Sequence, residues 1–111
     1  MTTPERTARA YIAASNRCDY EAMSDLFHQD AEWLPLAPIE PRRGRAAIRD
    51  RYLHEVRPMN APIVRDVYTA DATRCVVTFD VEHPEHGVVP IVDVFDVDAA
   101  GEITRLAVYR K

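Results

Sequence analysis

The stretch VVPIVDVFDVD, residues 88–98, decides the fold because its side chains alternate as they do on a β-strand. Apart from Asp93, one face of this strand carries only apolar side chains: Val89, Ile91, Phe95 and Val97. The opposite face ends in two aspartates and tolerates water. The acid on the apolar face either pairs with an arginine of the next strand, Arg105 or Arg110, or serves a cavity. A buried ion pair would keep Asp93 ionised, whereas an apolar cavity disfavours its charged form.

The segments around this strand predict helices followed by an antiparallel sheet. Three helices are expected from caps and apolar spacing: 2–15, 19–30 and 45–56. A short strand at 31–34 separates the last two helices. From residue 62 the apolar period changes to two, which predicts four strands: 62–69, 73–82, 87–98 and 102–111. Helices followed by a meander indicate an α+β fold.

Length and composition predict one globular domain spanning residues 1–111. The net charge of −4 lacks the basic field that nucleic acids require, so no nucleic-acid partner is expected. No apolar stretch reaches the length of a bilayer span and no signal peptide is recognised, so we expect no membrane partner and a cytoplasmic location. His83 and His86 supply only two metal ligands, and we expect neither a metal nor a cofactor.

Three segments in this order cover most of the chain: ARAYIAASNRCDYEAMSDLFHQDAEW (8–33), GRAAIRDRY (44–52) and VDVFDVDAAGEITRLAVY (92–109). They resemble the nuclear transport factor 2-like superfamily, and within it the branch of ketosteroid isomerases and SnoaL-like polyketide cyclases. The resemblance implies three N-terminal helices packed on a curved, mixed but mostly antiparallel sheet, which forms a cone with an internal pocket. It also implies a homodimer formed through the outer face of the sheet.

The resemblance assigns three side chains to the candidate catalytic site. Tyr11 and Asp93 fall where ketosteroid isomerases hold the two hydrogen-bond donors of an oxyanion hole, a tyrosine and a protonated aspartic acid. Tyr52 falls where a bacterial isomerase has a tyrosine that supports the first. The implied function is therefore a small-molecule isomerase- or cyclase-like enzyme that moves a proton on an apolar carbonyl compound.

The same resemblance predicts which residues bind the apolar organic ligand. Five side chains would line the pocket: Trp33, Phe79, Phe95, Leu106 and Val108. Arg110 would lie at the pocket mouth. Glu40 stands in a proline-rich loop of the kind that overhangs the pocket, which makes it the candidate proton acceptor.

Two positions depart from the catalytic pattern of these families. Pro35 stands where ketosteroid isomerases carry their catalytic aspartate, and Val108 stands where epoxide hydrolases and SnoaL-type cyclases carry theirs. A general base typically contributes 10²- to 10⁴-fold to the rate, so its absence matters. The alternative function is a non-catalytic, dimeric module of the same fold that binds a small ligand or acts as an accessory protein.

Overall fold

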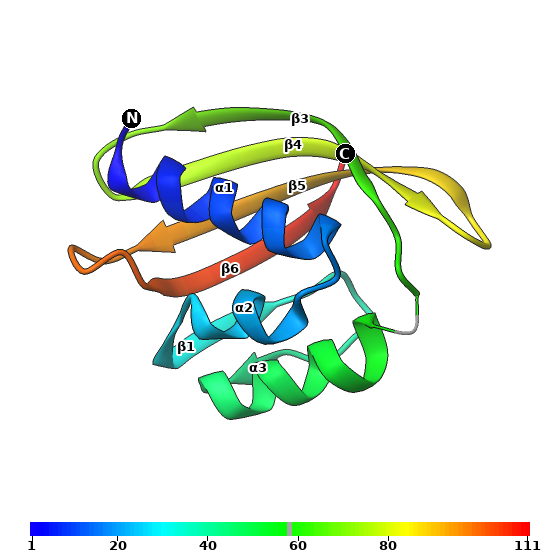
Figure 1. The fold of residues 1–111 in the computed structure, drawn as a ribbon, viewed down its shortest axis with the longest axis horizontal. Coiled ribbons are helices and arrows are strands. Elements are labelled where there is room, and N and C mark those ends of the chain that lie inside the picture. The colour runs from blue at the N-terminus through cyan, green and yellow to red at the C-terminus, as the bar shows by residue number, and fades with distance from the viewer. Residues whose placement is uncertain (58) are drawn as a thin grey trace.

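The computed structural model describes residues 1–57 and 59–111, and it places three helices on one face of a six-stranded sheet (Figure 1). The helices are α1 (Thr3–Asn16), α2 (Tyr20–Asp25) and α3 (Arg45–Arg51), the last continued by the π-helical turn η1 (Tyr52–Val56). The strands are β1 (Phe27–Leu34), β2 (Arg42–Arg43), β3 (Ile63–Ala70), β4 (Arg74–His83), β5 (Gly87–Val97) and β6 (Ile103–Arg110). None of the described helices is long and apolar enough to cross a membrane.

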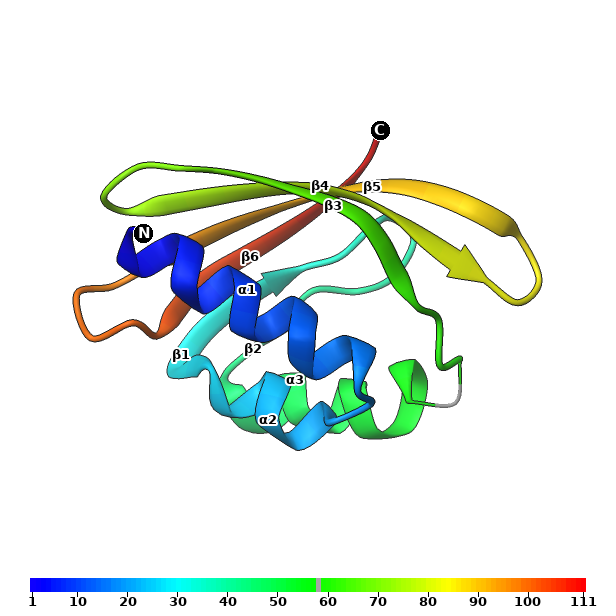
Figure 2. The same cartoon turned by 45° about the horizontal axis from the view of Figure 1, so that its top comes forward.

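The sheet is mixed but mostly antiparallel, with the strand order β2-β1-β6-β5-β4-β3. Only the β1–β6 pair is parallel among the described strands, and the other neighbours run antiparallel. Figure 2 shows the sheet curving over the helices, which leaves its opposite face uncovered. This confirms the predicted α+β cone.

Each helix begins next to a residue that favours a helix start. The Thr2 Oγ1 atom accepts a hydrogen bond from the Glu5 amide at 3.2 Å, and Asp19 accepts one from the Ala22 amide at 3.1 Å. Gly44 precedes α3 with a φ of +92°, a conformation that glycine adopts without strain. Thr2 and Asp19, the first residues of the helix ranges predicted at 2–15 and 19–30, are therefore confirmed as caps.

The end of the second helix was predicted wrongly. The expected helix over 19–30 stops at Asp25, and β1 already begins at Phe27. Phe27 pairs with Ile103 at the start of the parallel β1–β6 ladder, and its fully buried ring lies 6.1 Å from the ring of Tyr11. Because this pairing joins segments far apart in the chain, the local apolar spacing gave no sign of it.

The register of the three central strands surrounds Asp93 with apolar side chains. Val77 of β4 and Val108 of β6 each lie directly opposite Asp93 of β5. Along the same concave face of the sheet, Phe95 and Leu106 are fully buried. The alternation predicted for residues 88–98 is confirmed, because Asp93 points to the buried side.

Candidate functional site

A cavity of about 200 Å³ lies between the helices and the concave face of the sheet. Its polar lining residues within the described chain are Tyr11, Ser15, Tyr20, Tyr52 and Asp93. Aliphatic, aromatic and methionine side chains form the rest of its wall. Small-molecule sites characteristically combine such an apolar wall with a few placed polar groups.

Asp93 lines this cavity as a buried acid without a protein partner. Its residue surface is 4% exposed, and the described residues offer its carboxyl no hydrogen bond or ion pair. Burial raises the pKa of the Asp93 carboxyl to about 8, so the acid is mostly protonated at neutral pH. A protonated carboxyl is a hydrogen-bond donor.

The predicted alternative, an ion pair between Asp93 and a neighbouring arginine, is not found. Arg105 lies 3.9 Å from Asp96, on the outer side of the sheet. Arg110 is exposed and stands opposite Ile91. Alternation along β6 explains the position of Arg105, whereas Arg110 lies two residues beyond Val108, the residue opposite Asp93.

Tyr11 and Tyr52 form a hydrogen-bonded pair at the cavity wall. Their hydroxyl oxygens are 2.6 Å apart, and both residues are buried. Burial raises the pKa of both hydroxyls above the usual tyrosine range, and the nearby Arg51 guanidinium opposes this shift. If Tyr52 donates within the pair, the hydroxyl hydrogen of Tyr11 remains free for a ligand.

Arg51 fixes the position of Trp33, a role that sequence reasoning missed. Its guanidinium carbon lies 5.1 Å from the centre of the Trp33 ring, and its side chain is only 10% exposed. Arg51 also pairs with Glu55, and Trp33 packs edge-on against Tyr52 with ring centres 6.2 Å apart. Nothing in the spacing of Arg51 along the chain indicated this contact.

The structure divides the predicted ligand-binding residues into two groups. Trp33, Phe79 and Val108 line the cavity together with the tyrosine pair and Asp93. Phe95 and Leu106 do not line it, because they face each other in the fully buried core, where the Phe95 ring lies 5.0 Å from that of Tyr11.

Glu40 and Arg110 also lie outside the cavity wall. Glu40 is exposed in the loop after β1, and its backbone carbonyl accepts a hydrogen bond from Arg42 at 2.6 Å. Arg110 is exposed at the end of β6. The proline-rich loop therefore does not place Glu40 among the residues that line the cavity, and its role as proton acceptor stays a prediction.

Some cavity residues were not recognised from the sequence. Tyr20 and Met23 of α2 line the cavity, as do Met59, Ala61 and Ile63 before and at the start of β3. Met23 contributes to the apolar spacing from which the helix over 19–30 was predicted, which was a usable signal. Met59 is 36% exposed, which marks this side as the cavity mouth.

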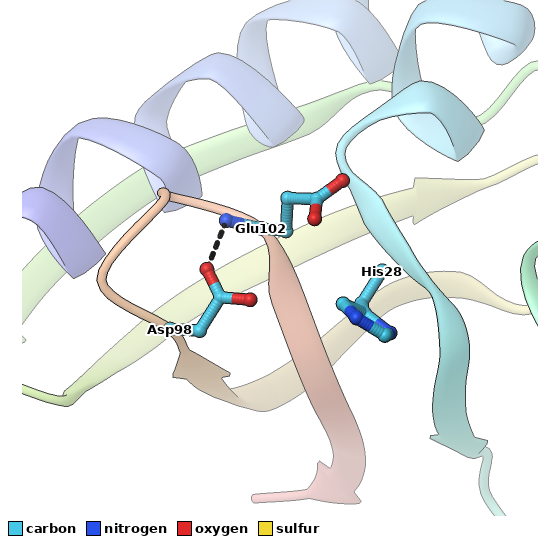
Figure 3. A group of neighbouring side chains, drawn as sticks. All are labelled: His28, Asp98 and Glu102. Carbon is cyan, nitrogen blue, oxygen red and sulfur yellow. Dashed lines mark hydrogen bonds between the residues drawn. The ribbon is translucent and has the colours of Figure 1, made fainter.

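A second polar group lies away from the cavity, where β1 meets the turn between β5 and β6 (Figure 3). One ligand atom each of His28, Asp98 and Glu102 lies within 4.8 Å of the others. However, the His28 Nδ1 atom accepts a hydrogen bond from the Asp30 amide at 3.0 Å. A neutral imidazole then carries its proton on Nε2, so neither nitrogen offers a free lone pair to a cation. We therefore assign no metal to this group.

The fold and the cavity define a cone-shaped α+β protein with a small apolar pocket that contains a buried acid and a tyrosine pair. Residues 8–106 match the model of the SnoaL-like domain family. The chain therefore belongs to the SnoaL-like domain family, within the nuclear transport factor 2-like superfamily.

Solved structures share the fold over nearly the whole chain. A protein from Sphaerobacter thermophilus is 27% identical with a TM-score of 0.82, and the match covers 95% of this chain and 93% of that one. A proposed polyketide cyclase from Xanthomonas campestris pv. campestris is 26% identical with a TM-score of 0.83, covering 98% and 90%. RV0760c from Mycobacterium tuberculosis, solved with estradiol-17beta-hemisuccinate, is 13% identical with a TM-score of 0.83 and covers 98% and 94%. At that identity the last comparison concerns the fold alone.

Proposed function

We propose that this protein is an isomerase- or cyclase-like enzyme that acts on an apolar carbonyl compound. The observation that carries the proposal is the unpaired, mostly protonated carboxyl of Asp93 in an apolar cavity that Tyr11 also lines. Asp93 and Tyr11 would donate hydrogen bonds to the carbonyl oxygen as it gains negative charge. Removing one preorganised donor of this kind typically lowers the rate by about 10²- to 10³-fold. The similarity to a proposed polyketide cyclase supports carbonyl chemistry.

In this proposal Tyr52 acts on the ligand only through Tyr11. The two hydroxyl oxygens are 2.6 Å apart, and we assign the donor role to Tyr52, which leaves the Tyr11 hydrogen for the substrate. Arg51 makes Tyr11 a stronger hydrogen-bond donor, because its positive charge lowers the pKa of the Tyr11 hydroxyl. Tyr52 and Arg51 are therefore positioning residues.

The proton acceptor is the part of the mechanism that the cavity wall does not supply. Asp93 is the only carboxylic acid among the described lining residues, and no described histidine lines the cavity. As a protonated donor, Asp93 does not serve as the base. The proton would then pass to water or to a second group of the substrate.

This shortage of a base favours a second candidate function, a non-catalytic module that binds a small apolar ligand. Pro35 and Val108 stand at the positions where relatives carry their catalytic acids, and Val108 reaches the cavity as an apolar side chain. The two functions share the same binding geometry. They differ only in whether a proton leaves the bound compound.

Two measurements on the wild-type protein separate these functions. Calorimetry with 4-propylphenol tests binding, because the phenol oxygen imitates the enolic oxygen of the proposed intermediate. Proton NMR in D₂O then follows exchange of the α-protons of 3-methylcyclohex-2-enone. We expect binding together with exchange faster than in buffer. Binding with exchange at the buffer rate would favour the non-catalytic module, and the absence of both would contradict both functions.

We also propose that the protein forms a homodimer through the outer face of its sheet. This face lies opposite the helices and carries half-buried Val92 and Val94 beside Tyr109, which is 51% exposed. Val94 lies opposite Val76 and Ala107 in the sheet, so the centre of the face is apolar. An apolar patch on an uncovered sheet face is typical of protein interfaces.

The substitution Val94→Glu is expected to convert the dimer to a monomer. A buried carboxylate without a partner at the centre of an interface opposes association strongly. Sedimentation velocity at micromolar concentration measures the change, with Ala10→Glu as the control because it adds the same charge to an exposed position of α1. A wild-type protein that sediments as a monomer, or a Val94→Glu protein that remains dimeric, would contradict this interface.

A further inference from the structure

The size of the cavity limits how much of a ligand it can enclose. An apolar cavity of about 150 Å³ binds a benzene molecule, and this cavity measures about 200 Å³. By proportion it encloses about eight non-hydrogen atoms, which corresponds to one six-membered ring with an oxygen and one further substituent. A fused four-ring compound would have to leave most of its surface outside.

The wall of the cavity is rigid at the end that would contact this ring. Trp33 is held between the Arg51 guanidinium, 5.1 Å from its ring centre, and the edge of Tyr52. Phe79 and Ile91 lie opposite each other on neighbouring strands and form a further part of the wall. Close-packed side chains on a sheet do not move apart easily. A longer ligand can therefore extend only toward the mouth, where Met59 is partly exposed.

The charge of the wall limits the ligand in a second way. No lysine or arginine lines the cavity among the described residues. A carboxylate or phosphate in this space would lose its hydration without gaining a cation. The available polar partners are hydroxyl groups and the Asp93 carboxyl, which suit a neutral oxygen acceptor.

We propose that the substrate or ligand is a neutral, single-ring carbonyl compound whose ring is enclosed by Trp33, Phe79 and Val108 and whose oxygen faces Asp93 and Tyr11. This assignment rests on the proposed function, since it uses the same donors. It adds the size and the charge of the bound compound. It also makes Val108, which lies opposite Asp93 in the sheet, a specificity-determining residue.

A series of 4-alkylphenols up to hexyl, titrated calorimetrically at pH 6, measures the enclosed length. Each added methylene should improve the dissociation constant roughly threefold to fourfold while it enters the cavity. With phenol itself as the first member of the series, we expect this gain to stop at methyl or ethyl, the point at which the cavity is full. Val108→Ala should move the break to a chain one or two carbons longer. Val88→Ala removes the same atoms from an exposed position away from the cavity and should leave the break unchanged.

The same titrations test the charge requirement and separate this inference from the proposed function. We expect 4-ethylbenzoate to bind at least tenfold more weakly than 4-ethylphenol. Equal binding of the two, or a gain per methylene that continues through hexyl, would overturn the single-ring, neutral assignment while leaving the donor pair in place. If instead no phenol binds, or binding is the same in Asp93→Leu, the proposed function fails and this inference fails with it.

Discussion

Asp93→Leu is expected to bind 4-propylphenol at least tenfold more weakly than the wild type and, at the same time, to be more stable at pH 7. The loss of binding follows because leucine removes one of the two donors that face the ligand oxygen. A tenfold loss corresponds to about 1.4 kcal/mol. If the protein catalyses proton exchange, the rate should fall by about 10²- to 10³-fold, the usual effect of losing one such donor.

The gain in stability follows from the position of Asp93. The carboxyl is buried beside Val77 and Val108 and has no partner within the described structure. The folded protein must therefore keep a proton on an acid that the unfolded chain would release at pH 7. Leucine removes this penalty and adds apolar surface to the core, so we expect the unfolding free energy to rise by about 2 to 4 kcal/mol.

Urea denaturation at pH 7 measures the stability, and calorimetry measures the binding. Asp93→Asn is the matched control, because its amide keeps an N–H donor of similar shape but cannot ionise. It should retain part of the binding that leucine loses. A leucine variant that is less stable than the wild type would mean that Asp93 has a structural partner, and unchanged binding would remove Asp93 from the site.

The β5 strand explains why the central residue of the site could be predicted from the sequence. A strand alternates strictly, so the position of Asp93 among Ile91, Phe95 and Val97 already fixed the face on which it lies. The resemblance then supplied Tyr11 and Tyr52, and the structure places these two hydroxyls 2.6 Å apart. Periodicity predicts faces well because it depends on neighbouring residues alone.

The remaining parts of the site depend on contacts that local patterns do not contain. The start of β1 at Phe27 depends on parallel pairing with β6, more than seventy residues away along the chain. The packing of Arg51 on Trp33 joins a helix to a strand through side-chain stacking that has no sequence signature. The Glu40 loop contains several prolines, which predict a loop but not the direction in which it turns.

These observations suggest that the protein retains an unfavourable group for the sake of its pocket. An acid with an apolar wall and no partner contributes nothing to folding that a leucine would not contribute better. Functional sites are the places where such local conflicts are expected to persist. The unfolding free energy of the wild type should therefore depend on the ionisation of Asp93, and measurements at several pH values should show this dependence.

The stability of the wild type is expected to fall as the pH rises from about 4 to about 8. The pKa of Asp93 is about 8 in the folded protein and 3.8 in its ordinary state, so over this range the folded state holds a proton that the unfolded chain has released. The stabilising effect of this proton is complete below the ordinary pKa and is lost as the pH approaches the folded value. At about 1.4 kcal/mol per pH unit, the loss reaches on the order of 4 kcal/mol at pH 7.

Ligand binding should also depend on the ionisation of Asp93, at pH values above about 8. Above pH 8 the carboxyl loses the proton that it donates, and the resulting negative charge repels the electron-rich oxygen of the ligand. The affinity for neutral 3-methylcyclohex-2-enone should therefore be level below about pH 7 and fall roughly tenfold per pH unit well above pH 8. Urea denaturation from pH 5 to 9.5 measures the stability, and NMR titration with the ketone over the same range measures the affinity. Asp93→Asn, measured at each pH, is the reference for all other titrating groups. A difference between the two proteins that does not change with pH would show that Asp93 is already ionised in the folded state, and the acid would then not be the donor.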